Sequence, residues 1–224
     1  MFDGHGGREV AKYAEKYFES CVKSQPEYEA NDFKVALRKG FMDVDVRLRN
    51  GGLDEVAEMK RKNPPMKSPI MKILSESMPK PGEGNSESDE GLMLDGIGCT
   101  ANVILVDHER KKLIVANAGD SRCVMGHGGK CTALSFDHKP ENQTEIDRIY
   151  KAGSVITEGR VDGNLNLTRA LGDLRHKNKE NIAQEDQPIT ANPDVFEYDM
   201  PADLDFIIMG CDGVWEQKTN EEMV

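Results

Sequence analysis

Three aspartates, each beside a glycine, are the feature that most constrains the fold of this chain. Asp3, Asp120 and Asp212 share this setting, and the last two follow apolar segments that we predict to be strands. Carboxylates at strand ends can converge at one rim of a sheet, where they repel one another unless a cation neutralises them. Two divalent ions bridged by aspartate would do so, and would also activate water for an in-line displacement at phosphorus. On spacing alone, three unrelated Asp-Gly turns remain an alternative.

The first of these aspartates lies in a segment with further chemical potential. Residues 2–7 add His5 and three glycines to Asp3. Aspartate is a hard oxygen ligand for Mg²⁺ or Mn²⁺, and histidine is the side chain best placed to move protons near neutral pH. Glycine allows the backbone to approach a ligand closely. An ordinary glycine-rich turn is the alternative interpretation of this segment.

The N-terminal part of the chain is predicted to be helical. Apolar residues recur at helical spacing over residues 8–24. A second helix is expected to start after the cap signal at Asn31 and Asp32 and to end at 50–52. A third, at 141–152, is expected to end at a glycine cap at Gly153. The apolar face of this third helix would comprise Ile146, Ile149 and Tyr150.

The chain beyond residue 99 is rich in predicted strands. We expect a meander of short antiparallel strands within residues 100–134. The nearly continuous apolar run at 101–106 predicts burial on both faces, with helices covering the sheet. Further elements are expected as strands at 154–157 and 160–166 around a turn at 162–164, a compact turn at 168–171, and strands at 195–198 and 205–211.

Residues 53–91 differ in composition from the rest of the chain. Five prolines lie in this stretch, and Gly, Ser and Glu dominate its last ten residues. We predict a flexible surface insertion, with a short helical piece near 54–61. A docking or regulatory role for the insertion is the alternative.

Charge and cysteine usage exclude several classes of partner. Among the 224 residues, acidic residues outnumber basic ones by 40 − 29 = 11, which disfavours nucleic acid or an anionic membrane as a partner. The five cysteines are dispersed without a C-x-x-C pair, as in proteins of reducing compartments. No signal peptide and no apolar run of membrane-spanning length is visible. We therefore expect a cytoplasmic or nuclear protein without membrane insertion, and a monomer.

Six ordered motifs extend this interpretation. Together they resemble the metal-dependent serine/threonine protein phosphatases of type 2C, in order and approximate spacing across nearly the whole chain. The motifs occupy residues 2–7, 98–101, 116–122, 137–140, 168–173 and 211–216.

The resemblance implies roles for three residues of the first motif and for Asp212 of the last one. Asp3 would bridge two catalytic Mg²⁺ or Mn²⁺ ions, and Gly4 would offer its backbone carbonyl to one of them. Asp212 would bind the other side of the pair. His5 would act as general acid toward the seryl or threonyl oxygen that leaves, a role suited to its pKa range.

A third, looser ion is also implied. Asp120 would help to bind it, together with Asp212 and Glu216, although Glu216 stands where the family commonly has aspartate. We expect weakened or altered binding at that site. Arg169 and Asp173 are expected to brace their loop by a salt bridge. The residues that bind the substrate are not predicted.

The resemblance implies an α+β fold, with two antiparallel β-sheets packed as a sandwich and flanked by helices. Residues 1–224 would form a single catalytic domain that is incomplete at both ends, because the family has further strands with metal ligands on either side. The implied activity is hydrolysis of phosphoserine and phosphothreonine in proteins by a metal-activated water. The alternatives are a catalytically impaired fragment or pseudo-enzyme that acts as a binding module, and one part of a longer, ordinary enzyme.

Overall fold

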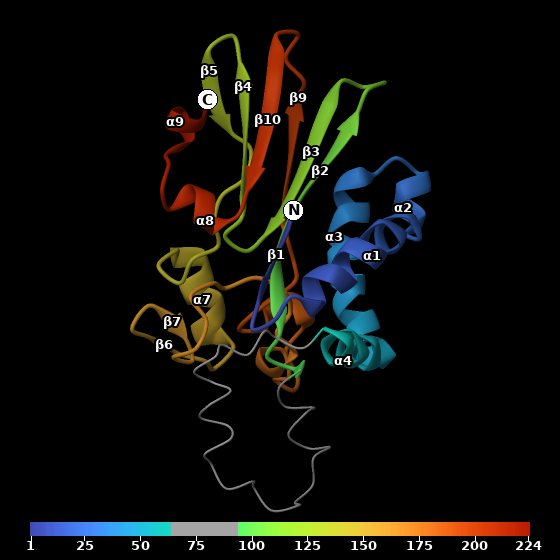
Figure 1. Cartoon of the computed structure of the whole chain (residues 1–224), viewed down its shortest axis with the longest axis vertical. Coiled ribbons are helices and arrows are strands. Elements are labelled where there is room, and N and C mark those ends of the chain that lie inside the picture. The colour runs from blue at the N-terminus through green and yellow to red at the C-terminus, as the bar shows by residue number, and fades with distance from the viewer. Residues whose placement is uncertain (64–93) are drawn as a thin grey trace, which may run out of the picture.

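A computed structural model describes residues 1–63 and 94–224, which form three packed layers (Figure 1). The layers are a group of helices, a five-stranded sheet (sheet A) and a three-stranded sheet (sheet B). This arrangement confirms the predicted α+β sandwich of two antiparallel sheets with flanking helices.

Antiparallel pairing holds within both sheets. Sheet A has the order β1-β2-β3-β9, with β8 also paired to the start of β2, and sheet B has the order β10-β4-β5. The strands of sheet A are β1 (Phe2–His5), β2 (Gly98–Asp107), β3 (Lys112–Ala118), β8 (Leu171–Gly172) and β9 (Asp194–Asp199). Those of sheet B are β4 (Arg122–His127), β5 (Lys130–Ala133) and β10 (Leu204–Gly210).

The central strand β3 explains why the sandwich has two cores. Its side chains alternate between the two faces of sheet A. Leu113 and Val115 are buried against sheet B, whereas Ile114 and Ala116 are buried in the cluster formed with the helices. Since both sets are apolar, β3 holds the helical layer and sheet B on opposite sides of sheet A.

The helical layer covers one face of sheet A (Figure 1). Within it, the rings of Phe18 and Phe41 meet edge to face, with centroids 5.0 Å apart. The side chain of Asp32 accepts a hydrogen bond from the backbone N–H of Val35, as the predicted cap requires. The helices are α1 (Glu9–Lys23), α2 (Pro26–Glu29), α3 (Phe33–Arg47) and α4 (Leu53–Lys62), with a π-helical segment (Leu48–Gly52) before α4.

A smaller apolar cluster, separate from the two main cores, is formed by residues between Ile149 and Ile189. Ile149 of α7 (Gln143–Lys151) is fully buried in it. The other elements outside the sheets are the hairpin β6 (Ile156–Thr157) and β7 (Arg160–Val161), the 3₁₀ turns Leu174–His176 and Gln184–Asp186, and the short helices α8 (Asp212–Trp215) and α9 (Asn220–Met223). None of the helices in the two described ranges is long and apolar enough to cross a membrane.

The helices predicted at 8–24, after Asp32 and at 141–152 are confirmed as α1, α3 and α7. The helical piece expected near 54–61 is observed as α4, but this part of the presumed insertion is packed, because Val56 is fully buried against the main core. Residues 64–91 of the insertion lie outside the described residues.

Two strand predictions need correction. The segment 100–134 is not one meander, because the chain crosses from sheet A to sheet B between β3 and β4. The run 101–106 is buried on both faces only at its start, and Val106 near the end of β2 is 39% exposed.

Three local predictions were also wrong. The segment 168–171 is extended rather than a compact turn, since Leu171 enters β8. Tyr150 is 54% exposed and does not belong to the apolar face of α7. The strand expected at 160–166 is limited to β7, whereas the turn expected at 162–164 is confirmed, with positive φ at Asp162 and Gly163 and an antiparallel bridge between Val161 and Leu165.

Candidate active site

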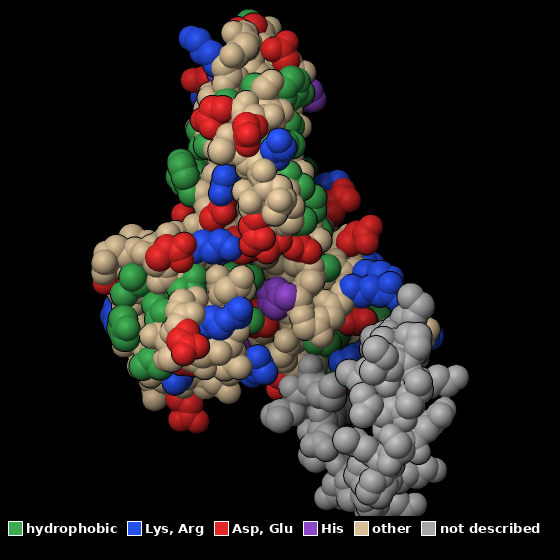
Figure 2. Space-filling model, turned by 60° about the vertical axis from the view of Figure 1, so that its left-hand side comes forward, with side chains coloured by type: hydrophobic (Ala, Val, Ile, Leu, Met, Phe, Trp, Pro, Cys, Tyr) green, Lys and Arg blue, Asp and Glu red, His purple; other side chains and the backbone are tan. Residues whose placement is uncertain are grey.

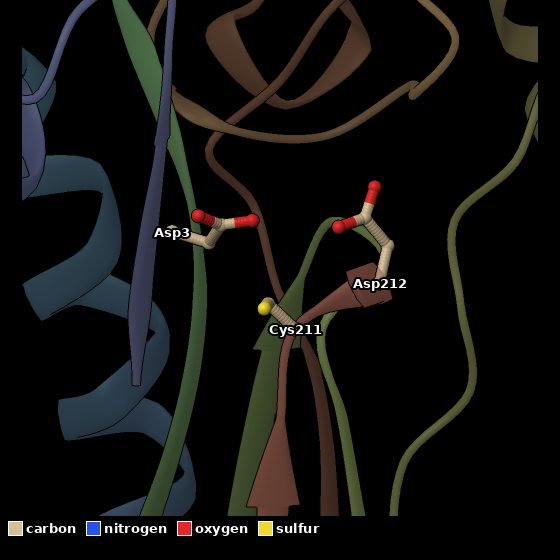
Figure 3. Close-up of side chains that lie close together, drawn as sticks. All are labelled: Asp3, Cys211 and Asp212. Atoms are coloured by element: carbon tan, nitrogen blue, oxygen red, sulfur yellow. The ribbon is translucent and has the colours of Figure 1, made fainter. Parts of the chain in front are cut away.

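Acidic side chains gather in a band across the middle of one face of the molecule (Figure 2). Two of the predicted metal ligands meet in a group of potential ligand atoms that lie within 4.8 Å of one another, formed by Asp3, Cys211 and Asp212. Figure 3 shows the two carboxylates pointing toward each other, with the Cys211 sulfur beside them. The site therefore joins the edges of two sheets, because Asp3 lies on β1 of sheet A and Asp212 opens α8, which begins two residues after the end of β10 of sheet B.

The pKa of Asp3 is raised above its ordinary value. Burial is the largest cause, and the negative charges of Asp212 and Asp120 add to it, while His5 opposes the shift. Carboxylates that disfavour each other's ionisation in this way are a ready site for a cation. The donor set fits a divalent ion: the carboxylate oxygens suit Mg²⁺ or Mn²⁺, and the Cys211 sulfur is a softer donor.

Asp120 lies close enough to raise the pKa of Asp3, but its own charge is balanced by a lysine side chain. It is buried, and its carboxylate forms a salt bridge with Lys139. Burial alone would lower the pKa of Lys139, but the hydrogen bond and charge of Asp120 raise it. Gly119, just before Asp120, has a φ of +118°, and a Cβ there would lie 2.7 Å from Thr100. This turn therefore requires glycine to place Asp120 at the end of β3.

A chain of polar contacts ties this turn to α7. His138 accepts a hydrogen bond from the Gly119 N–H through Nδ1 (3.2 Å), so Nε2 is the donor to Asp194 (3.2 Å). Asp194 also accepts from Arg169 (2.8 Å), and Arg169 in turn donates to Glu145 on α7 (2.6 Å to Oε1). Gly119, the residue next to Asp120, is thus held by His138 and connected through Asp194 and Arg169 to α7.

His5 is hydrogen-bonded to Asp173, a residue that the sequence analysis had paired with Arg169. Its Nε2 lies 2.5 Å from Oδ2 of Asp173, which is fully buried, while the ring remains 26% exposed. Burial lowers the pKa of His5, but the hydrogen bond and charge of Asp173 outweigh it, so that the net shift is upward. The expected salt bridge between Arg169 and Asp173 is wrong, because Arg169 pairs with Glu145 and Asp194 instead.

Of the other predicted ligands, Gly4 would bind through its backbone and is the neighbour of Asp3 on β1, whereas Asp120 and Glu216 lie outside the group of side-chain atoms found in the described residues. Gly4 lies in the β1-β2 ladder opposite Cys99. Glu216 is exposed at the end of α8.

Sequence reasoning missed three residues of this region and gave a fourth, Asp173, the wrong partner. Lys139 and Asp173 lie inside motifs that had been recognised, at 137–140 and 168–173, but their partners are distant in the sequence. Cys211 likewise belongs to the last motif. Nothing in the sequence around Asp194 indicated a functional role, since it only precedes the strand predicted at 195–198.

Comparison with known proteins agrees with these features. A family model described as "Protein phosphatase 2C" matches residues 52–224. "Probable protein phosphatase 2C 21" of Arabidopsis thaliana is 38% identical over 234 residues, which cover 100% of this chain and 65% of that protein. "Protein phosphatase 2C homolog 2" of Schizosaccharomyces pombe is 36% identical over 225 residues, covering 100% of this chain and 50% of that protein.

A solved structure described as serine-threonine phosphatase 2C from Toxoplasma gondii superposes with a TM-score of 0.64. It is 16% identical, and the match covers 99% of this chain and 69% of that one, so the similarity concerns the fold alone. The chain spans 65% of the Arabidopsis relative and 64% of "Probable protein phosphatase 2C 11" of Oryza sativa subsp. japonica.

Proposed function

The chain belongs to the protein phosphatase 2C family, and on this basis we propose that it hydrolyses phosphoserine and phosphothreonine in proteins with the help of Mg²⁺ or Mn²⁺. The observation that carries the proposal is the meeting of Asp3 and Asp212, at the edges of two different sheets, within 4.8 Å of each other. His5 is two residues from Asp3 on the same strand, with part of its ring exposed. The site thus combines ligands for a divalent cation with a group able to transfer a proton.

The residues of the site would divide the work. Asp3 and Asp212 would hold the ions, which supply an activated water and stabilise negative charge at phosphorus. A serine or threonine oxygen is a poor leaving group, so its departure needs a proton, which His5 would donate. Asp120 and Glu216 would contribute to a third, looser ion, for which Asp120 would have to exchange its contact with Lys139.

The proposal is tested by measuring phosphate release from a phosphothreonine peptide, with and without MnCl₂. We expect Mn²⁺-dependent turnover by the chain that is lost in Asp3→Asn and in Asp212→Asn. Asp205→Asn is the matched control, because Asp205 is an exposed aspartate on β10, the strand that leads to Asp212. It should retain the activity of the unchanged chain.

Two other results would change the assignment. Turnover that persists in both site variants would refute the metal ligands named here. Mn²⁺ binding without turnover, measured by calorimetry, would favour the alternative of a catalytically impaired binding module.

A further inference from the structure

Asp173 is a buried carboxylate with an unusual setting. Its side chain is completely inaccessible, and Oδ1 has no hydrogen-bond partner within the described residues. Its backbone has a φ of +49°, a left-handed conformation that is uncommon outside glycine. A buried carboxylate with an unpaired oxygen costs stability, so structural support alone does not account for it.

Among the described residues, the ring of His5 is the one hydrogen-bond partner of this carboxylate. Oδ2 lies 2.5 Å from Nε2, and the two residues are separated by 168 positions in the sequence. Because a carboxylate only accepts, the ring must present Nε2–H to Asp173. Nδ1 has no hydrogen-bond partner in the part of the chain that the structure describes, and the side chain is partly exposed.

The segment that carries Asp173 is held on both sides. The Asp173 N–H donates to the Ile97 carbonyl (2.9 Å), and the Gly172 N–H donates to Oδ1 of Asp45 on α3 (2.8 Å). Gly98 lies against the pair, and any Cβ at that position would overlap Oδ2 of Asp173. The carboxylate is therefore fixed in place before a substrate arrives.

We propose that Asp173 is a positioning residue for the reaction. It holds Nε2 of His5, orients the ring, and leaves Nδ1 to deliver the proton to the departing seryl or threonyl oxygen. The bond between phosphorus and that oxygen breaks as the O–H bond forms, and the N–H bond at Nδ1 of the protonated ring breaks, which leaves a neutral ring with its proton on Nε2. This inference rests on the proposed phosphatase function and adds the residue that directs its proton donor.

The test compares two substrates that differ in their need for a proton. A phosphoserine peptide releases an alkoxide that must be protonated, whereas p-nitrophenyl phosphate releases a stabilised phenolate. Asp173→Asn removes the negative charge and replaces one carboxylate oxygen by an N–H donor, and asparagine tolerates the left-handed backbone. We expect kcat on the peptide to fall about 100-fold or more, the usual scale of general acid catalysis, with KM nearly unchanged. On p-nitrophenyl phosphate the loss should stay below about 10-fold.

Asp162→Asn is the matched control, because Asp162 is also an aspartate with a φ of +49° but makes its hydrogen bonds to Ser154 and Val155. It should leave both substrates unaffected. Equal losses on the two substrates, or full peptide activity in Asp173→Asn, would overturn the inference.

A spectroscopic measurement decides the pairing without turnover. Nitrogen-15 NMR of histidine-labelled protein, with His5 identified by its loss in His5→Gln, should show the proton of the neutral ring on Nε2. In Asp173→Asn this preference should disappear. A wild-type ring with its proton on Nδ1 would overturn the proposal even if the variant does not fold. Absence of Mn²⁺-dependent hydrolysis in the wild type, by contrast, would refute the phosphatase function, and with it the role of Asp173 in that reaction.

Discussion

Replacing Glu145 by glutamine should produce the largest stability loss among single changes around α7. The carboxylate is buried and accepts hydrogen bonds from Arg148 (2.5 Å), Arg169 (2.6 Å) and the Thr168 hydroxyl (2.6 Å). A neutral glutamine removes the negative charge that balances the two largely buried guanidinium groups of Arg148 and Arg169. Removing one partner of a buried ion pair typically costs about 3–5 kcal/mol, and we expect a loss of this size at pH 7.

The pH dependence of this loss follows from the pKa of Glu145. Burial would raise it, but the two arginines and Thr168 outweigh burial and lower the pKa from 4.5 to about 2. At about 1.4 kcal/mol per pKa unit, ionised Glu145 contributes about 3 kcal/mol to the free energy of unfolding. Because the folded pKa is the lower one, this contribution is complete above about pH 4.5 and is lost as the pH falls toward 2.

The measurement is urea unfolding followed by circular dichroism at pH 7 and pH 3. The difference between the wild type and Glu145→Gln should be about 2 kcal/mol smaller at pH 3 than at pH 7. Asp147→Asn removes an exposed carboxylate from the same helix and should change stability by less than about 0.5 kcal/mol. A difference below about 1 kcal/mol at pH 7, or one that is the same at both pH values, would refute this reasoning.

Three further predictions concern groups near the site. Gly98→Ala should abolish peptide hydrolysis with little change in Mn²⁺ affinity, because the added methyl group overlaps Asp173; normal kcat would contradict this. Lys139→Met should enlarge the increase in melting temperature caused by MnCl₂, since Asp120 loses its counter-ion; an equal or smaller increase than in the wild type would count against it. Lys177→Met should cost about 3–5 kcal/mol in urea unfolding, because a buried carboxylate on α3 loses its partner; a change within about 0.5 kcal/mol would show that the pair adds little.

Most secondary-structure elements could be predicted from local pattern. The periodicity of α1 and α3 and the cap at Asp32 are local properties, and they mark a helix wherever it packs. The strands β2 and β3 were also recognisable, but their sheet was not. Sequence pattern does not show that β4 leaves sheet A, because the choice of partner strand depends on contacts with β10, which lies far away in the chain.

The same distinction between local pattern and long-range contacts applies to the candidate active site. The sequence motifs, and not spacing alone, led us to group Asp3, Asp120 and Asp212, since each lies beside glycine in a segment that resembles one family. Only the tertiary structure decided what each side chain contacts: it brings Asp212 to Asp3 and places Asp173 against His5. The physical reason is that helices and strands arise from neighbours in the sequence, whereas a buried charge takes whatever partner the packed layers bring within hydrogen-bond distance.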